Sequence, residues 1–268
     1  MKQSKQDNVY FFWSSSILLC MLIAVFVLGF TSCQSGDKKT ATVFPSPAQT
    51  AASPSASPPA SSQASAGPTR LAQTDDMGQE YVDKFVFLGD STTYGLGHYN
   101  VVGPNQVWTP KSGTLTLALW DTATIVYPED NTEISIAEAV AKKKPAYMLV
   151  TLGVNGVSFM DEATFKKTYT ALVNTIKQQS SGTKIILNSI YPIAVADYSG
   201  ITNEKIDTAN TWVEKIAADT GVRYLDSESA IKDSTGAMPM DISNDKKLHM
   251  NEEGYERVIN YLRTHGYK

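Results

Sequence analysis

Cysteine is almost absent from this 268-residue chain, and both cysteines, Cys20 and Cys33, fall within the first 33 residues. The rest of the chain must therefore be stable without disulfide bonds, and it has no thiol to act as a nucleophile or a zinc ligand. Histidine is also scarce: His98, His249 and His265 are the only three, and no two of them have the spacing of metal ligands. We therefore expect no metal site.

Clustered positive charge is lacking as well. The chain has 23 Lys and Arg against 27 Asp and Glu, and its one basic cluster is the lysine triplet at 142–144. Binding to nucleic acid requires a basic patch, so the net charge of −4 argues against nucleic acid as a partner. Two phosphate- or ester-related motifs are missing too, since the sequence has no Gly-x-Ser-x-Gly elbow and no Gly-Lys-Ser/Thr loop.

Residues 1–33 have the layout of an export signal. Two lysines precede the apolar run "ILLCMLIAVFVLGF", which ends in the small residues of "TSC". This layout resembles a bacterial lipoprotein signal, in which Cys33 becomes lipidated and the leader is removed, although Phe30 stands where leucine is usual. The alternative is an uncleaved transmembrane anchor over residues 9–30, a stretch about long enough to cross a bilayer. Both interpretations predict a chain tethered at the extracellular face of the bacterial cytoplasmic membrane.

Residues 34–76 are mostly Ser, Ala, Pro, Thr and Gln. Such a segment buries too little apolar surface to offset the entropy of ordering it, so we predict a disordered spacer. The remaining 192 residues, 77–268, are enough for one domain with a well-buried core.

Within 77–268 short apolar runs alternate with helical periodicity, which predicts an α/β domain around a parallel sheet. The expected strands are "KFVFLGD" (84–90), "AYMLVTLG" (146–153), "TKIILNSIYP" (183–192) and "VRYLD" (222–226), and the expected helices cover 136–144, 161–180, 203–221 and 251–266. The region 98–131 is less regular, but "TLTLALW" and "TATIVY" alternate like strands and suggest a β-rich excursion.

Three polar or small residues stand where ligands gather in such a sheet, beyond the carboxyl ends of its strands. Ser91 begins a helix directly after the first strand, where a hydroxyl nucleophile and a free backbone N–H can coincide, although Asp-Ser-Thr is also a common helix cap. Asn155, in "LGVNG", can donate its amide to an oxyanion or can simply form a turn. Gly113, before a possible strand, offers a weaker backbone donor.

A histidine with a nearby carboxylate precedes the last helix. His249 lies in "NDKKLHMNEEGY", with Asp245 four residues before it and Asp241 close by. A neutral imidazole oriented by a carboxylate is the base that a serine hydroxyl requires, because the hydroxyl is hardly ionised near neutral pH. Together with Ser91, this segment supplies the parts of a nucleophilic site.

These residues resemble the blocks of the SGNH, or GDSL-type, hydrolases. "GDS" with Ser91 matches the nucleophile block, Asn155 in "GVNG" the oxyanion asparagine, Gly113 the second-block glycine and His249 the base. The resemblance implies a three-layer α/β/α sandwich with a parallel, flavodoxin-like sheet. It also implies ester hydrolysis through an acyl-enzyme, without a cofactor, with Ser91, Gly113 and Asn155 forming the oxyanion hole.

Two positions depart from the family pattern. Gly156 replaces the aspartate that usually follows the block asparagine, and Lys246 stands three residues before His249, where an aspartate is usual. A lysine cannot accept the imidazole N–H. Asp245 can orient His249 if the loop bulges by one residue; otherwise Asp241 or a backbone carbonyl must do so.

The sequence therefore predicts a membrane-tethered serine esterase whose substrate is a small-molecule or polysaccharide ester, with O-acetyl groups on polysaccharide favoured by the predicted location. A lysophospholipase or other lipid esterase is the alternative within the same chemistry. A catalytically inactive carbohydrate-binding module of the same fold is the alternative from another class.

Overall fold

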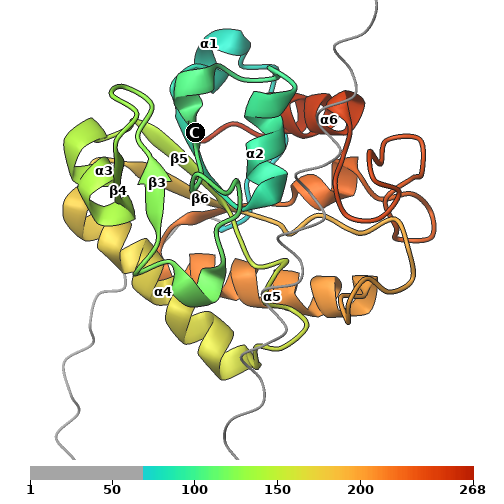
Figure 1. Ribbon diagram of the computed structural model, residues 1–268. Coiled ribbons are helices and arrows are strands. Elements are labelled where there is room, and N and C mark those ends of the chain that lie inside the picture. The colour runs from blue at the N-terminus through green and yellow to red at the C-terminus, as the bar shows by residue number, and fades with distance from the viewer. Residues whose placement is uncertain (1–68) are drawn as a thin grey trace, which may run out of the picture. The chain divides into compact units, whose positions relative to one another are not determined.

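The computed structural model describes residues 69–268, and the predictions for the leader, for Cys33 and for the spacer before residue 69 lie outside them. A five-stranded sheet forms the centre of this domain, in the order β2-β1-β5-β6-β7, with every neighbouring pair parallel (Figure 1). Its strands are β1 (Phe85–Gly89), β2 (Val107–Trp108), β5 (Tyr147–Thr151), β6 (Lys184–Asn188) and β7 (Arg223–Leu225). A separate antiparallel pair consists of β3 (Thr124–Val126) and β4 (Glu133–Ser135).

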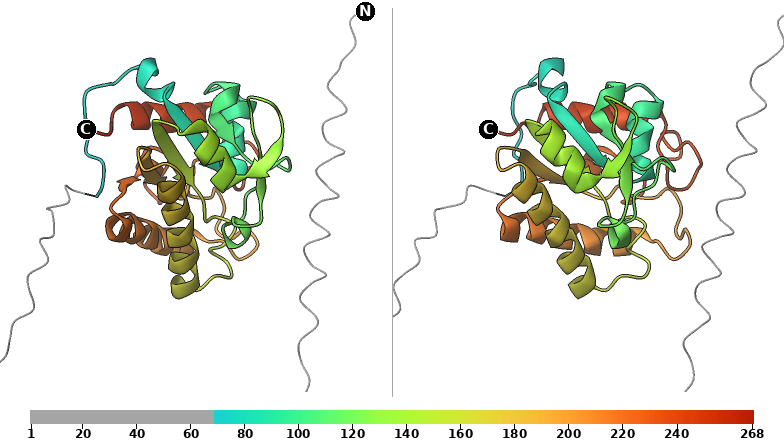
Figure 2. Two further views of the ribbon diagram at one scale, coloured as in Figure 1. Left: turned by 90° about the vertical axis from the view of Figure 1, so that its left-hand side faces the viewer. Right: turned by 60° about the vertical axis from the view of Figure 1, so that its left-hand side comes forward.

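Helices cover both faces of the sheet and make three layers, as Figures 1 and 2 show. The helices are α1 (Gln79–Val82), α2 (Ser91–His98), α3 (Ile136–Lys143), α4 (Glu162–Gln179), α5 (Asn203–Thr220) and α6 (Glu252–Arg263). Side chains alternate along each buried strand, so that β1 directs Val86 and Leu88 toward α3, α4 and α5, and Phe85 and Phe87 toward α1, α2 and α6. The fold is the expected three-layer α/β/α sandwich.

The helices begin where the sequence signals predict, because polar side chains satisfy their first backbone N–H groups. Asp161 caps α4 by accepting from Thr164 N, and Asn251 caps α6 by accepting from Gly254 N. These caps matter for function because α6 follows directly on the loop that carries His249. Within residues 69–268, no helix is both long and apolar enough to cross a bilayer.

The region from 98 to 131 is less β-rich than we expected. Residues 124–126 do form β3, but the alternation in "TLTLALW" belongs to irregular chain and a 3₁₀ helix, η2 (Leu117–Leu119), rather than to a strand. Leu115 and Leu117 are buried, but Leu119, the next leucine of the alternation, is 60% exposed. A period of two in the sequence therefore does not require a strand.

An N-terminal strap, which we define as residues 69–77, extends the domain beyond the expected start at residue 77. Leu71 is buried, its N–H donates to the carbonyl of Tyr224 at 2.8 Å, and Tyr224 N–H donates to the carbonyl of Thr69 at 3.0 Å. The strap therefore pairs in parallel with the outer edge of β7. Its last residue, Met77, bonds to the end of α6 through the carbonyl of Arg263.

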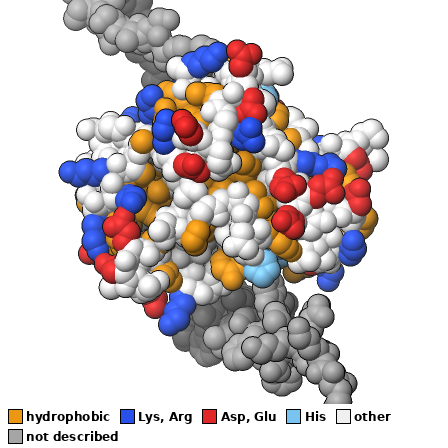
Figure 3. Space-filling view, turned by 90° about the horizontal axis from the view of Figure 1, so that it is seen from above, with side chains coloured by type: hydrophobic (Ala, Val, Ile, Leu, Met, Phe, Trp, Pro, Cys, Tyr) orange, Lys and Arg blue, Asp and Glu red, His pale blue; other side chains and the backbone are white. Residues whose placement is uncertain are grey.

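Charged side chains of both signs are interspersed with apolar ones on the face seen in Figure 3. Strong single-sign fields attract oppositely charged polymers, and this face presents none. The mixed surface agrees with the small net charge of the sequence.

Candidate active site

Ser91 is the first residue of α2, which begins immediately after the fully buried strand β1. The cap of this helix is Asp90, whose side chain accepts from Thr92 N at 2.9 Å and from Thr92 Oγ1 at 2.7 Å. Asp90 is therefore the residue of this motif that caps the helix, and the Ser91 hydroxyl is not used for capping. The N–H groups of a first helical turn have no partner within the helix, so Ser91 presents both a hydroxyl and a backbone donor.

Ser91, His249 and Asp245 form one hydrogen-bonded series. His249 Nε2 lies 2.9 Å from Ser91 Oγ, and His249 Nδ1 lies 2.7 Å from Asp245 Oδ2. Both distances are within the normal range for hydrogen bonds between nitrogen and oxygen. With Nδ1–H donating to the carboxylate, Nε2 is the acceptor for the serine proton.

The loop before α6 bulges at Lys246, whose φ of 61° is in the left-handed region. This conformation turns Asp245 back over its own loop, where Oδ1 accepts from the backbone N–H groups of Lys247, Leu248 and His249 at 2.8, 2.8 and 3.1 Å. Asp245 therefore reaches the imidazole from four residues away, and Asp241 is not needed for that contact.

The Asp245 carboxylate is held in its ionised form. Burial alone would raise its pKa, but the hydrogen bonds from the His249 ring and from the loop N–H groups outweigh burial and hold the pKa well below the usual range. A carboxylate that stays charged keeps the proton of His249 on Nδ1 and stabilises the imidazolium formed when Nε2 takes up a proton.

Asn155 lies in the turn after β5, and its Nδ2 is buried with no hydrogen-bond partner among the residues described. The turn is closed by Gly156 N–H and Val157 N–H, which donate to the carbonyl of Gly153 at 2.7 and 3.1 Å. An unpaired buried donor is costly, and such groups in native proteins commonly mark a functional site. This amide is available to an oxyanion.

Gly113 does not supply the expected backbone donor. Its N–H donates to the carbonyl of Pro110 at 2.7 Å and closes a turn, in which Gly113 has a φ of 76°. A Cβ at this position would lie 3.3 Å from the ring of Tyr94 on α2. Gly113 thus forms a tight turn packed against the helix that carries Ser91, and its N–H is bonded to Pro110 and is not available to an oxyanion.

Asp90 is a buried carboxyl that the sequence suggested only as a cap. It is 1% exposed, and burial raises its pKa to about 6 despite the hydrogen bonds from Thr92 and the nearby imidazole of His249. A second titratable group therefore lies at the N-terminus of α2, next to Ser91.

A buried polar network joins the carboxyl ends of the strands beside the site. Asn188, at the end of β6, donates from Nδ2 to Thr151 Oγ1 at 3.2 Å and to Tyr191 Oη at 2.8 Å, and it accepts from Ser227 Oγ at 2.6 Å. Sequence reasoning missed this network, although a polar residue that ends an apolar strand, as in "IILNS", is a signal for it. The network fixes the end of β5, from which the Asn155 turn departs.

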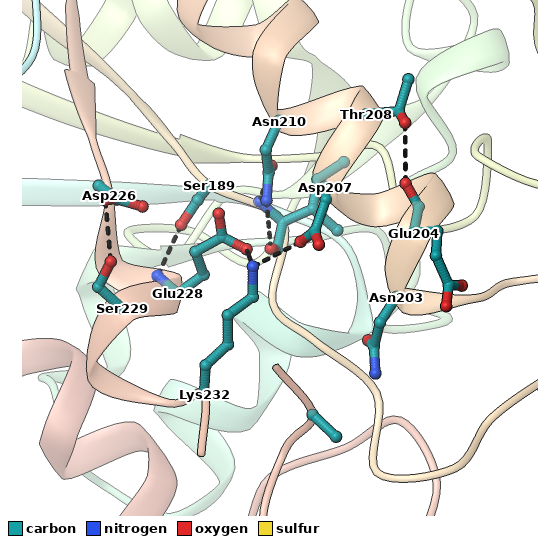
Figure 4. Close-up of polar contacts among 12 residues, drawn as sticks. Ser189, Asn203, Glu204, Asp207, Thr208, Asn210, Asp226, Glu228, Ser229 and Lys232 are labelled. Carbon is teal, nitrogen blue, oxygen red and sulfur yellow. Dashed lines mark hydrogen bonds and ion pairs between the residues drawn. The ribbon is translucent and has the colours of Figure 1, made fainter. Parts of the chain in front are cut away.

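Further from Ser91, polar contacts attach the 3₁₀ helix η3 (Ser227–Ala230) to its surroundings (Figure 4). Glu228 N–H donates to Ser189 Oγ at 2.8 Å, and Lys232 Nζ pairs with Glu228 and Asp207 at 2.6 and 2.5 Å. The charges in this group pair with one another, which is the pattern of a structural tie. In residues 69–268 no cluster of three or more His, Cys, Asp or Glu has the geometry of a metal site.

The site has the parts of a serine hydrolase. The Ser91 hydroxyl is hydrogen-bonded to an imidazole that a carboxylate orients, and Asn155 supplies a buried amide donor. The profile of the GDSL-like lipase/acylhydrolase family matches residues 87–257, a segment that contains all of these residues. The chain belongs to this family. It is a serine hydrolase that acts on ester bonds.

Two solved structures are similar to this chain at low identity. An acetylxylan esterase from Geobacillus stearothermophilus has 16% identity and a TM-score of 0.44, and the similarity covers 75% of this chain and 97% of that one. A GDSL-like lipase from Bacteroides thetaiotaomicron has 16% identity and a TM-score of 0.47, covering 72% of this chain and 89% of that one. A search of curated proteins found no match.

Proposed function

We propose that this chain is an exported, membrane-tethered esterase that removes O-acetyl groups from polysaccharide, with Ser91 as nucleophile. The observation that carries the catalytic part is a pair of hydrogen bonds made by His249. Its Nε2 lies 2.9 Å from Ser91 Oγ, and its Nδ1 lies 2.7 Å from Asp245 Oδ2. The same series favours an enzyme over an inactive carbohydrate-binding module, which has no need of an oriented imidazole beside a hydroxyl.

In the first half of the reaction, His249 Nε2 takes the proton of Ser91 Oγ as that oxygen bonds to the ester carbonyl carbon. The carbonyl oxygen becomes an oxyanion, which accepts hydrogen bonds from Ser91 N–H and Asn155 Nδ2. The bond between this carbon and the alcohol oxygen then breaks. His249 gives its proton to the leaving alcohol, and an acyl group remains on Ser91.

In the second half, a water molecule gives a proton to His249 Nε2 and attacks the acyl carbon. The bond to Ser91 Oγ breaks, the proton returns to that oxygen, and the acid leaves. Asp245 keeps its negative charge throughout and stabilises the imidazolium that forms in each half.

The polysaccharide and the tether are supported by the sequence. A basic start, an apolar run and "TSC" precede a Ser/Ala/Pro-rich segment, an order typical of export and attachment through Cys33 or an uncleaved anchor. A tethered esterase outside the cytoplasm meets acetylated polymers of the cell surface or surroundings. Mass analysis of the mature N-terminus tests the attachment: a diacylated Cys33 supports lipidation, and an intact leader supports the transmembrane anchor.

The catalytic proposal is tested by hydrolysis of p-nitrophenyl acetate and of longer acyl esters by residues 69–268. We expect a preference for acetate and its loss in Ser91→Ala and His249→Ala. In Asp245→Asn, kcat should fall about 10⁴-fold, because the amide Nδ2–H would face Nδ1 and force the wrong tautomer. Preference for long acyl chains would favour the lipid esterase, and unchanged activity in Ser91→Ala would refute the site.

A further inference from the structure

A groove of about 500 Å³ opens next to the Asn155 turn, between the turn at 157–161 and the first half of α5. Its lining includes Phe159 and Asp161 on one side and Glu204, Thr208 and Trp212 on the other. This groove does not contain Ser91, His249 or Asp245, so the site described above does not account for it.

We propose that this groove is a subsite for a neutral sugar residue of the acetylated polysaccharide, an inference that rests on the proposed function. The groove begins close to the oxyanion donor along the chain, because Val157 in its lining is two residues after Asn155. Two residues of extended chain span at most about 7 Å. A polymer with an acetyl group at Ser91 therefore has the groove within reach of its neighbouring sugars.

The aromatic side chains of the groove are suited to the apolar C–H face of a sugar ring. Phe159 is 64% exposed and lies in the lining of the groove, so its ring is accessible to a ligand there. Trp212 is partly buried and is fixed by an edge contact with Phe165, with ring centroids 5.5 Å apart. Aromatic rings held in this way provide contact area with little loss of side-chain entropy on binding.

The polar side chains of the groove are suited to the hydroxyl rim of a sugar. The carboxylates of Asp161 and Glu204 are exposed acceptors, and Thr208 Oγ1 donates to the carbonyl of Glu204 at 2.8 Å, as Figure 4 shows. Ionised carboxylates accept hydrogen bonds from hydroxyl groups and cannot donate. An acyl chain offers no hydrogen-bond donor and would leave these carboxylates without a partner in the ligand.

The charge of the groove selects against acidic sugars. The cation in its lining is Lys205, whose Nζ donates to the carbonyl of Gly200 at 2.7 Å and is thereby directed to the backbone. The two carboxylates of Asp161 and Glu204 outnumber the single ammonium of Lys205, so the lining has a net negative charge. A uronic acid or another anionic residue is repelled, whereas a neutral sugar is not.

The test compares two substrates, p-nitrophenyl acetate and a chemically acetylated cellohexaose, in the 69–268 chain and in Phe159→Ala. We expect the ratio of kcat/KM for the oligosaccharide to kcat/KM for the small ester to fall about tenfold in Phe159→Ala. Leu119→Ala, which removes another exposed apolar side chain (60%) outside the groove, is the matched control and should leave both activities unchanged.

Binding is measured separately by titration calorimetry of unacetylated cellohexaose into Ser91→Ala. We expect a heat of binding for this variant and none for the double variant that also carries Phe159→Ala. An unchanged ratio and an unchanged heat overturn the subsite while hydrolysis of p-nitrophenyl acetate still supports the esterase. Equal binding of an oligogalacturonate overturns the assignment to neutral sugars. Absence of hydrolysis of both esters by the unsubstituted chain refutes the proposed function itself.

Discussion

At the scale of single residues, Asn155 combines a cost in stability with a use in catalysis. Its Nδ2 is buried without a hydrogen-bond partner in the described part of the chain, and such a group costs about 1–3 kcal/mol of folding free energy. A donor that waits for a developing oxyanion is worth about 10²–10³ in kcat. Stability and activity therefore make opposite demands at this position.

We predict that Asn155→Ala lowers kcat for p-nitrophenyl acetate about 10²–10³-fold with little change in KM, because the lost interaction forms mainly in the transition state. The same variant should be as stable as the unsubstituted chain or more stable by about 1 kcal/mol, since the unpaired donor is removed. Steady-state kinetics and urea unfolding measure the two effects. A large loss of stability would mean that Asn155 is needed for the turn.

The buried carboxyl of Asp90 predicts how the stability of the domain depends on pH. Its pKa is raised from 3.8 to about 6 by burial, so the folded state binds more protons than the unfolded state between these values, and stability falls as pH rises through this window. The penalty is absent below about 3.8 and complete above about 6, where it corresponds to about 3 kcal/mol. Asp245 has the opposite shift, and its stabilisation is lost only at lower pH.

In Asp90→Asn this penalty disappears, while the amide oxygen can still accept from Thr92. We therefore expect the free energy of unfolding of Asp90→Asn, relative to the unsubstituted chain, to rise by about 2 kcal/mol between pH 4.5 and pH 7.5. Urea titrations at both pH values measure this difference. A difference that does not change with pH would show that Asp90 stays ionised across the range.

The sequence allowed some of the site residues to be predicted because each has a local signal. Ser91 and Asn155 follow apolar strands, and His249 precedes a periodic helix. Asp245 remained one of three alternatives, because its contact depends on a left-handed lysine, and Lys246 carries no sequence signal for that conformation. Gly113 was misassigned because the partner of a backbone N–H depends on the turn, which residue type alone does not fix.

At the scale of the elements, α2 and α6 approach each other more closely than ordinary side chains allow. A Cβ on Gly95 of α2 would lie 2.1 Å from Tyr255 Oη of α6, and Tyr255 is almost fully buried, so it cannot move aside. Helix α2 carries the nucleophile Ser91, and α6 follows the loop that carries the base His249. A shift of α2 away from α6 would therefore change the 2.9 Å spacing between Ser91 Oγ and His249 Nε2.

We predict that Gly95→Ala destabilises the domain by about 1–3 kcal/mol and lowers kcat, because α2 must shift away from α6. Gly182→Ala is the matched control, since no atom lies within 4 Å of its added Cβ, and it should be neutral or slightly stabilising. Thermal unfolding and ester hydrolysis of the two variants provide the comparison. An active, fully stable Gly95→Ala would show that the helices are not closely constrained.

The elements that sequence patterns located best are the long helices and the buried strands, whose periodicity extends over whole segments. The expected helices at 161–180 and 203–221 correspond to α4 and α5 within a residue or two. The region 98–131 was harder to predict because its buried leucines are held by irregular chain and by η2. Burial there is set by tertiary contacts, which leave no repeat in the sequence.

At the scale of the whole molecule, the N-terminal strap belongs to the domain even though residues 69–76 fall within the segment predicted to be the spacer. Its partners, Tyr224, Glu214 and Arg263, lie far along the chain, so no local pattern reveals them. Arg70 bonds to Glu214 and Asp226, each at 2.7 Å, and the exposed position of Arg70 keeps these pairs modest in strength. Burial of Leu71 and the pairing with β7 are the larger contributions.

We predict that a chain of residues 77–268 is less stable than a chain of residues 69–268 by about 3 kcal/mol, from the exposed Leu71 site and the uncovered edge of β7. For a domain of this size that corresponds to a fall of about 6–12 °C in Tm. Calorimetry of the two chains measures it, and Arg70→Ala in the longer chain should account for about 1 kcal/mol or less. Equal Tm values would show that the strap only rests on the surface.

The parallel pairing of Thr69–Leu71 with β7 also gives the molecule a direction. The strap runs the same way as the strands, from their amino ends toward the edge where Ser91 and Asn155 lie. Thr69, the first residue that the structure describes, therefore lies toward the amino ends of the strands, away from Ser91. A large substrate can approach Ser91 without passing the point at which the described domain begins.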